Sequence, residues 1–417
     1  MKMIKRLMKK LKKKKNNIFL ELIYNIKIKN RALQFIALFF IMQNLLFPNI
    51  LSNINNKYIW INKESLIDTI KIDSVLSFVK ESNIENIFFQ VRSRGDALYE
   101  SQIVPKYEKI DSSFDPLNYV LEKTKDENIK VHAWFNTYML WSSPKIPKDS
   151  LHFYFQCQNC FATDFNGKSD SNIKLNQIQS QNWEGVFLSP LNNNVNKHIL
   201  LVIDELINTY DIDGLHLDYV RFQDMFYGYN EVGIKDFENK YSFNPKDLDR
   251  GLISPRFGYL DTEVDSLTKL WDDYKTNSIT NLIKSINNLI RSNDSSIKLS
   301  VAVKPNIIEA KYRWYQDWLT WIKLDLIDFA VVMNYDSNIN KFNFNNRLIN
   351  NSLTDFEKQK IVIGISTFNQ DPIDASDKII LSRLNGFNNF SIYNYNQKQI
   401  TDNWYNPLIN VFNFNIE

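Results

Sequence analysis

From residue 54 onward, the chain alternates between two patterns of apolar residues. Short runs of apolar, β-branched or aromatic residues predict strands, because such side chains pack well on a pleated surface. Between these runs, apolar residues recur three and four positions apart, as in 70–82, 199–210 and 264–293, which predicts helices with one buried face. The predicted strands are 58–61, 86–92, 130–136, 213–218, 297–304, 327–335, 360–366 and 389–395.

Strand and helix alternate eight times, and this order predicts a parallel sheet covered by helices. A count of eight favours an α/β fold of the closed kind, the (β/α)8 TIM barrel. A doubly wound open sheet is the alternative, but it normally has a glycine-rich phosphate loop after its first strand, and none follows 58–61. Residues 137–192 and 222–262, after strands three and four, are too long for ordinary connections and predict two long insertions at the carboxyl face.

Residues 1–53 differ in composition from the predicted barrel domain, 54–417. The first part is basic, with the run Lys12–Lys15, and the uncharged stretch Ala32–Phe47 follows it. A positive segment before an apolar core predicts an export signal or an uncleaved signal anchor, although this core is shorter than the roughly 20 residues of a membrane-spanning helix. A surface amphipathic helix is the alternative. We therefore expect an exported, periplasmic or otherwise extracytoplasmic protein that contacts the membrane only through this segment.

Charge and cysteine content narrow the possible partners. The formal net charge is +3, but the positive charge is concentrated in residues 1–31, so we expect no nucleic-acid partner for the rest of the chain. Cys157 and Cys160 are the only cysteines and are too few for a structural zinc site. In an exported chain they favour a small local disulfide. A redox-active pair is the alternative.

The most informative segment is the predicted fourth strand with the residues after it, D-G-L-H-L-D-Y-V-R-F at 213–222. Side chains two apart on a strand share a side, so His216 and Asp218 should lie together while the two leucines face the other way. A carboxylate at the C-terminal end of a barrel strand, with Arg221 three residues later, is typical of catalytic groups in this fold. An ordinary structural ion pair is the alternative explanation of Asp218.

Other strands also end in polar or aromatic residues, and the same alternation predicts that Gln90 and Arg92 point the same way. The expected substrate-binding residues are Gln90, Arg92, Asp96, Trp134, Asn136, His216, Arg221, Lys304 and Tyr335. Aromatic rings beside amides, cations and carboxylates suit a polyhydroxylated ligand, because sugar C–H faces stack on rings while hydroxyls take directional hydrogen bonds.

Other chemistries find little support in the sequence. There is no H-E-x-x-H, G-x-S-x-G or Walker motif, and we expect no cofactor. His216 and Asp218 could form a metal dyad, but no third ligand is evident, so no metal site is predicted.

Several motifs together resemble the glycosyl-hydrolase-like family 10 barrels, a bacterial group of exported proteins. They are F-F-Q-V-R-S-R-G-D-A-L-Y-E-S at 88–101, F-D-P-L at 114–117, V-H-A-W-F-N at 131–136, D-G-L-H-L-D-Y-V-R-F at 213–222, Q-D-W at 316–318 and M-N-Y at 333–335. The resemblance covers about residues 58–370 and implies a TIM barrel that acts on glycans, with bacterial cell-wall strands as a plausible substrate. It also implies that the catalytic Asp at the end of strand four is Asp218. The Cys157–Cys160 insert departs from the family pattern.

Glycoside hydrolysis normally uses two carboxyl groups. Asp218 is the first, as nucleophile or general base, and Arg221 or Arg92 could keep it ionised. We take Asp317 of the Q-D-W motif as the second, although an Asp at this position could instead cap the helix that follows. Asp336, Glu309 and Glu231 are the other candidates.

Three functions remain open at the level of the sequence. The first is a glycoside hydrolase of cell-wall or other polysaccharides, and the second is a catalytically silent glycan-binding barrel. The third is a metal-dependent deacetylase or a similar hydrolase. The sequence predicts neither the glycan linkage nor the oligomeric state.

Overall fold

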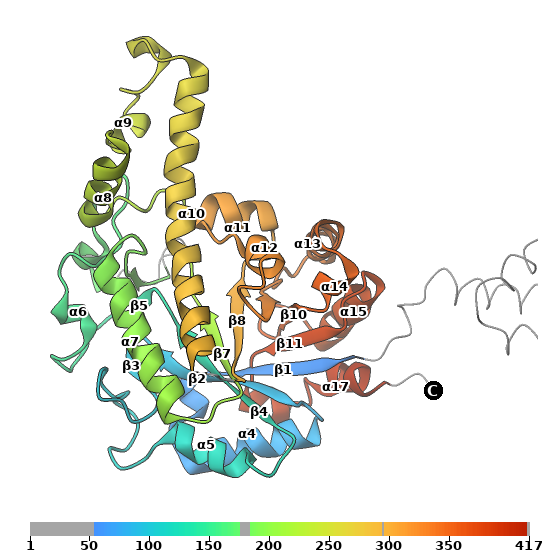
Figure 1. The fold of residues 1–417 in the computed structure, drawn as a ribbon. Coiled ribbons are helices and arrows are strands. Elements are labelled where there is room, and N and C mark those ends of the chain that lie inside the picture. The colour runs from blue at the N-terminus through green and yellow to red at the C-terminus, as the bar shows by residue number, and fades with distance from the viewer. Residues whose placement is uncertain (1–53, 176–183, 294–295, 415–417) are drawn as a thin grey trace, which may run out of the picture. The chain divides into compact units, whose positions relative to one another are not determined.

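The computed structural model describes residues 54–175, 184–293 and 296–414, which form one compact unit. Eight parallel strands make a closed barrel, because β1 pairs with both β2 and β11. The strands are β1 (Asn56–Ile61), β2 (Asn86–Ser93), β4 (Lys130–Asn136), β7 (Gly214–Asp218), β8 (Lys298–Val303), β9 (Phe329–Val332), β10 (Ile361–Ser366) and β11 (Asn389–Tyr393). Helices surround them (Figure 1), and the predicted (β/α)8 TIM barrel is confirmed.

The helices follow the apolar spacing of the sequence, and the three predicted ones are present as α4 (Thr69–Glu81), α7 (Asn193–Thr209) and α10 (Asp261–Ser292). Most begin at an Asp or Asn whose side chain accepts a hydrogen bond from a backbone N–H of the first turn, as Asp68 and Asn338 do. The longer helices are α4 (Thr69–Glu81), α5 (Pro116–Thr124), α7 (Asn193–Thr209), α8 (Glu231–Tyr241), α10 (Asp261–Ser292), α11 (Ile307–Trp314), α13 (Ile339–Ser352), α15 (Pro372–Leu384) and α17 (Asn406–Asn413). The shorter ones are α6 (Phe153–Gln156), α9 (Lys246–Asp249), α12 (Trp318–Lys323), α14 (Asp355–Lys358) and α16 (Gln397–Thr401).

Apolar residues form two layers, one on each side of the strands. The larger layer lies between the strands and the helices and contains Leu215 and Leu217 of β7. The smaller layer fills the barrel interior and is mostly aromatic, with Tyr58, Trp60, Phe88, Trp134, Ala302, Phe329, Val331 and Val362. Leu215 and Leu217, two residues apart on β7, therefore share a side, as the alternation predicts.

The interior is so tightly filled that one strand position accepts only glycine. A Cβ atom on Gly214 of β7 would lie 2.1 Å from Nδ1 of His132, whose ring projects inward from β4. Such a distance is far inside van der Waals contact, so the aromatic packing of β4 depends on a bare backbone in β7.

The two predicted insertions are present after β4 and β7. In the first, β5 (Met139–Trp141) pairs in antiparallel fashion with β6 (Val186–Phe187), and α6 lies between them in sequence. In the second, α8 and α9 precede the long helix α10, and Figure 1 shows these three helices extending beyond the ring of barrel helices.

The cysteines of the first insertion form a disulfide, Cys157–Cys160, as the sequence predicts. It spans a sequence separation of only 3, so it restricts the unfolded chain little.

We expect the double variant Cys157→Ala/Cys160→Ala to lower the free energy of unfolding by about 2 kcal/mol, measured by urea denaturation. Reduction of the wild type should have a similar effect. A loss as large as about 5 kcal/mol would show instead that this bond holds the whole insertion in place.

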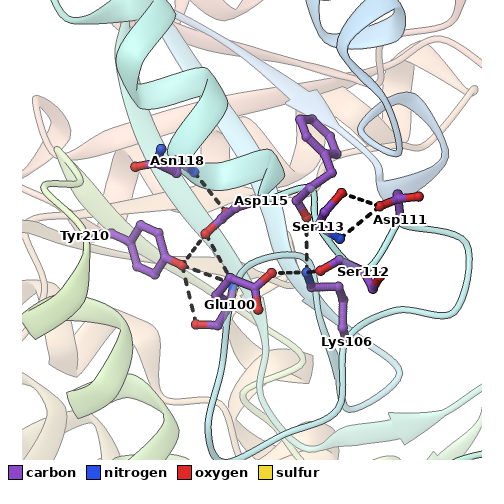
Figure 2. A network of polar contacts seen from close by, with 9 residues as sticks. Glu100, Lys106, Asp111, Ser112, Ser113, Asp115, Asn118 and Tyr210 are labelled. Carbon is purple, nitrogen blue, oxygen red and sulfur yellow. Dashed lines mark hydrogen bonds and ion pairs between the residues drawn. The ribbon is translucent and has the colours of Figure 1, made fainter.

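The connection from β2 to α5 is fixed by a polar network rather than by regular structure (Figure 2). After the short strand β3 (Asp96–Ala97), the Asp115 carboxylate accepts hydrogen bonds from Asn118 N at 3.0 Å and from Tyr210 Oη at 2.6 Å. Tyr210 is the C-cap residue after α7, so this one carboxylate joins the start of α5 to the end of α7. Lys106 forms an ion pair with Glu100 and donates to two backbone carbonyls.

The predicted export or anchor segment, within residues 1–53, lies outside the described residues. Within the described ranges, no helix is both long enough and apolar enough to cross a membrane.

Candidate active site

Asp218 ends β7 at the carboxyl face of the barrel and is almost completely buried. Its Oδ2 accepts a hydrogen bond from the Trp134 indole nitrogen at 3.2 Å, and its Oδ1 accepts one from the backbone N–H of Tyr219 at 2.7 Å. Tyr219 has a φ of +54°, a left-handed conformation that is costly for an aromatic residue. This backbone conformation places the Tyr219 N–H against the carboxylate, so both oxygens of Asp218 are held.

The environment of Asp218 raises the pKa of its carboxyl toward neutral pH. Burial raises the pKa of its carboxyl from 3.8 to about 6, against the opposing effects of the Tyr219 N–H, Arg221 and Trp134. Arg221 therefore favours the ionised form, as expected, but burial outweighs it. A carboxyl group with a pKa near 6 can both give and take a proton close to neutral pH.

Asp218→Asn is expected to stabilise the folded protein at neutral pH. The folded-state pKa is raised, so the stability contribution of this group is complete at low pH and is lost as the pH rises from 3.8 through about 6. Above that range, the buried carboxylate costs on the order of 3 kcal/mol, which a neutral Asn avoids. Urea unfolding across this range should show a stability difference between variant and wild type that widens and then levels off. A difference independent of pH would contradict the shift.

Aromatic residues surround Asp218. Tyr335, just beyond β9, stacks on Tyr393 of β11 with ring centroids 5.2 Å apart, and Trp134 packs edge-on against Trp60 at 4.8 Å. The Tyr335 hydroxyl is buried and has no hydrogen-bond partner in the described part of the chain. Its ring lies over Gly364 of β10, where a Cβ atom would be 2.7 Å from a backbone oxygen and 3.1 Å from Tyr335 Cε1. An unpaired hydroxyl near the buried Asp218 carboxyl is suited to receive a ligand.

A second carboxylate lies beside Asp218, and it comes from the first insertion. The Arg221 side chain is buried and forms an ion pair with Glu184, and Nζ of Lys304 is 4.0 Å from Oε1 of the same glutamate. Burial raises the pKa of Glu184, but the charges of Arg221 and Lys304 outweigh burial, so the pKa is lowered overall. Burial and the Arg221 charge lower the pKa of Lys304 to about 8.

Sequence reasoning missed Glu184. It lies within the Asn- and Ser-rich insertion, between Trp183 and Gly185, where no strand pattern or motif draws attention to it. The available signal was only that it is the single glutamate in residues 137–192.

Six of the predicted site residues gather around the end of β7. Asn136 is paired in register with Asp218, and its Oδ1 has no partner within the described ranges. The six are Asp218, Trp134, Asn136, Arg221, Lys304 and Tyr335.

Arg92 does not share the side of Gln90, so that prediction was wrong. The register between β2 and β4 shifts between these two residues, and the shift turns Arg92 away from the barrel interior. Its guanidinium lies over the ring of Phe135, which belongs to the outer apolar layer, and donates to the backbone oxygen of Asn136. Arg92 is completely buried, and its placement is structural.

The remaining predicted substrate contacts lie deeper or further around the barrel. His216 lies two residues before Asp218 on the strand, which places it roughly 7 Å deeper in the barrel. It is fully buried, its ring stacks on Phe88, and its Nδ1 lies 2.8 Å from the Ser300 hydroxyl oxygen. Gln90 accepts a hydrogen bond from the backbone of Lys63.

Asp96 lies with His152, 3.7 Å away, and not among the contacts of Asp218. Burial raises the pKa of the Asp96 carboxyl to about 7, against the effects of Lys63 and Arg92.

The carboxylates proposed as partners of Asp218 have contacts of their own. Asp317 accepts a hydrogen bond from Lys311 Nζ at 2.8 Å and occupies the N-cap position before α12, without a capping hydrogen bond from its side chain. Asp336 forms an ion pair with Lys341 of α13. Glu309 and Glu231 are exposed in the first turns of α11 and α8. The described residues contain no group of three or more His, Cys, Asp or Glu side chains that could hold a metal ion.

A family model described as glycosyl hydrolase-like 10 matches residues 51–378. The chain belongs to the glycosyl hydrolase-like 10 family. This confirms the resemblance seen in the motifs, and the matched range includes all the site residues named above except Tyr393.

Two curated glycosyl hydrolases share this part of the sequence. The chain is 23% identical to glycosyl hydrolase YngK of Bacillus subtilis over 251 residues, which are 58% of this chain and 40% of that protein. It is 25% identical to glycosyl hydrolase DigH of Escherichia coli over 163 residues, which are 36% of this chain and 33% of that protein. The aligned parts therefore span less than half of either relative.

Solved structures of other proteins have the same fold as this member of the glycosyl hydrolase-like 10 family. The PgaB (BpsB) glycoside hydrolase domain of Bordetella bronchiseptica matches with a TM-score of 0.63 and 11% identity, over 85% of this chain and 98% of that one. The catalytic domain of β-amylase from Paenibacillus polymyxa matches with a TM-score of 0.54 and 12% identity, over 82% and 93% of the two chains.

Proposed function

We propose that this protein is a glycoside hydrolase that cleaves O-glycosyl bonds in a polysaccharide, with Asp218 as a catalytic carboxyl. The observation that supports this most strongly is the environment of Asp218. A buried carboxyl with a pKa of about 6 lies at the carboxyl end of a barrel strand, held by Trp134 and the Tyr219 backbone. The rings of Tyr335 and Tyr393 provide faces for sugar stacking beside it.

The proposed substrate is the glycan strand of the bacterial cell wall. The family supports a glycan, and the aromatic lining suits sugars with apolar faces and acetamido groups. Residues Asn136 and Tyr335, each with an unpaired polar atom in the described part of the chain, are suited to hydrogen-bond sugar hydroxyls or amides.

We also propose that the protein acts outside the cytoplasm. The Cys157–Cys160 disulfide supports an oxidising compartment, and the basic and apolar segments of residues 1–53 support export. Fractionation of cells that produce the full chain would test this; recovery only with cytoplasmic markers would contradict it.

Incubation of the full chain with peptidoglycan strands freed of their peptides tests the hydrolase proposal. New reducing ends are expected with the wild type and not with Asp218→Asn, and chitin and amylose serve as comparison glycans. A catalytically silent glycan-binding barrel is the second candidate, favoured by the engagement of Glu184 and Asp317 in ion pairs. Binding of glycan by both proteins without any sugar release would support that candidate instead.

A further inference from the structure

We propose that Glu184 supplies the second carboxylate of the active site, opposite Asp218. This inference rests on the proposed glycosidase function and assigns to the first insertion a part of the chemistry. Glu184 precedes β6 by two residues, whereas Asp218 ends β7, so the pair would be assembled from the insertion and the barrel.

The backbone around Glu184 is held against the barrel mouth. A Cβ atom on Gly185 would lie 2.5 Å from the backbone oxygen of Trp141 in β5, so the chain passes Trp141 closely at this point. Just beyond, the backbone N–H of Phe187 donates to the Asp170 carboxylate at 2.8 Å, and Phe187 is paired with Met139 of β5. The pairing of β5 with β6 therefore fixes the position from which the Glu184 side chain extends.

Arg221 forms an ion pair with Glu184, and its charge also acts on Asp218. It lies three residues after Asp218, its guanidinium forms the ion pair with Glu184, and it lies over the rings of Phe187 and Tyr219. The Arg221 side chain is only 4% exposed, whereas that of Glu184 is 47% exposed. Glu184 thus has one side on a buried cation and the other open to solvent, as a group that must reach a substrate or a water molecule requires.

The environments of the two carboxyls move their pKa values apart. The charge of Glu184 contributes to the raised pKa of Asp218, while Arg221 and Lys304 lower the pKa of Glu184 itself. Two titratable groups whose environments separate their pKa values in this way are suited to divide the roles of acid and base. The competing candidate Asp317 pairs with Lys311 on α11, whereas the charge of Glu184 acts directly on Asp218.

The separated pKa values of Asp218 and Glu184 assign each carboxyl a step in the reaction. Asp218 is the general acid in this assignment, rather than the nucleophile or general base expected from the sequence. In its acid form it gives its proton to the glycosidic oxygen as the bond from that oxygen to the anomeric carbon breaks. A water molecule forms the new bond to the anomeric carbon, and its proton passes to the Glu184 carboxylate. Glu184 then loses this proton to solvent and Asp218 regains one, so that atoms and charges balance over the cycle.

The test compares the kinetics of Glu184→Gln, Asp317→Asn and wild type on peptide-free peptidoglycan strands, with the exposed Glu122→Gln on α5 as a matched control. We expect Glu184→Gln to lower kcat by about 10²- to 10⁴-fold with KM little changed, because it removes a general base and not a binding surface. Glu122→Gln should match the wild type. Loss of activity in Asp317→Asn together with normal activity in Glu184→Gln would overturn the proposal while leaving the hydrolase function intact.

Two further readouts separate catalysis from a structural role in holding Arg221. The fall of wild-type kcat/KM at acidic pH should reflect protonation of Glu184, whose charged neighbours are Arg221, Lys304 and Asp218. This acidic fall should be absent from the residual activity of Glu184→Gln. Azide should restore turnover of Glu184→Ala and give a glycosyl azide, since an anionic nucleophile needs no base. An acidic limb of the kcat/KM profile that is unchanged in Glu184→Gln, together with no azide product from Glu184→Ala, would overturn the proposal. A wild type that binds the strands and releases no reducing ends would refute the hydrolase function as well.

Discussion

Asp218→Asn is expected to lower kcat on the glycan substrate by about 10²- to 10⁴-fold while leaving glycan binding nearly unchanged. The Asn side chain keeps the shape of Asp and can still accept the Tyr219 N–H, but it cannot exchange a proton. Initial rates of reducing-end release, with binding measured separately by co-sedimentation with insoluble glycan, would provide the comparison.

The same variant is expected to be at least as stable as the wild type at neutral pH, so a loss of activity cannot be attributed to unfolding. Retention of more than about a tenth of the wild-type rate would contradict a role for Asp218 in proton transfer, because such roles are worth at least about 10²-fold. Activity would then have to depend on other groups at the barrel mouth.

Trp60→Ala is expected to be the most destabilising simple truncation, lowering the free energy of unfolding by about 3–5 kcal/mol. Trp60 is fully buried in the interior layer and contacts the rings of Phe88, Trp134, His216 and Tyr393. Its removal leaves a cavity that the closed barrel cannot collapse to fill. Urea denaturation at constant pH measures the loss.

Two controls accompany Trp60→Ala. Trp60→Phe keeps most of the ring volume and should cost clearly less, whereas Phe414→Ala, at a position 62% exposed, should stay within about 0.5 kcal/mol of the wild type. A loss below about 1 kcal/mol for Trp60→Ala would mean that the interior layer contributes little to folding.

The barrel was predictable because each strand carries its own periodic signal. Leu215 and Leu217 face the helices while His216 and Asp218 face inward, and this alternation could be seen in the sequence alone. The eight strands and their order follow from repeated local patterns and from the short reach of connections between neighbouring elements.

The candidate site was predictable only in part, because it also depends on features without a local pattern. The register shift that turns Arg92 outward is a property of how β2 pairs with β4, and nothing within 86–93 signals it. Glu184 reaches Arg221 through the fold of the first insertion, across 37 residues of sequence, and no periodicity predicts such a contact. Residues on strands could therefore be placed in advance, and a residue from the insertion could not.

The aromatic layer inside the barrel also determines how molecules move through the site. Because Tyr58, Trp60, Phe88 and Phe329 fill the interior, the barrel has a closed floor and no passage to its other end. Under the proposed hydrolase function, a polymer would enter, be cut and leave only across the mouth, where incoming and outgoing chains would compete for the same opening. Slow departure of the cut ends would then limit turnover on long strands more than on short ones.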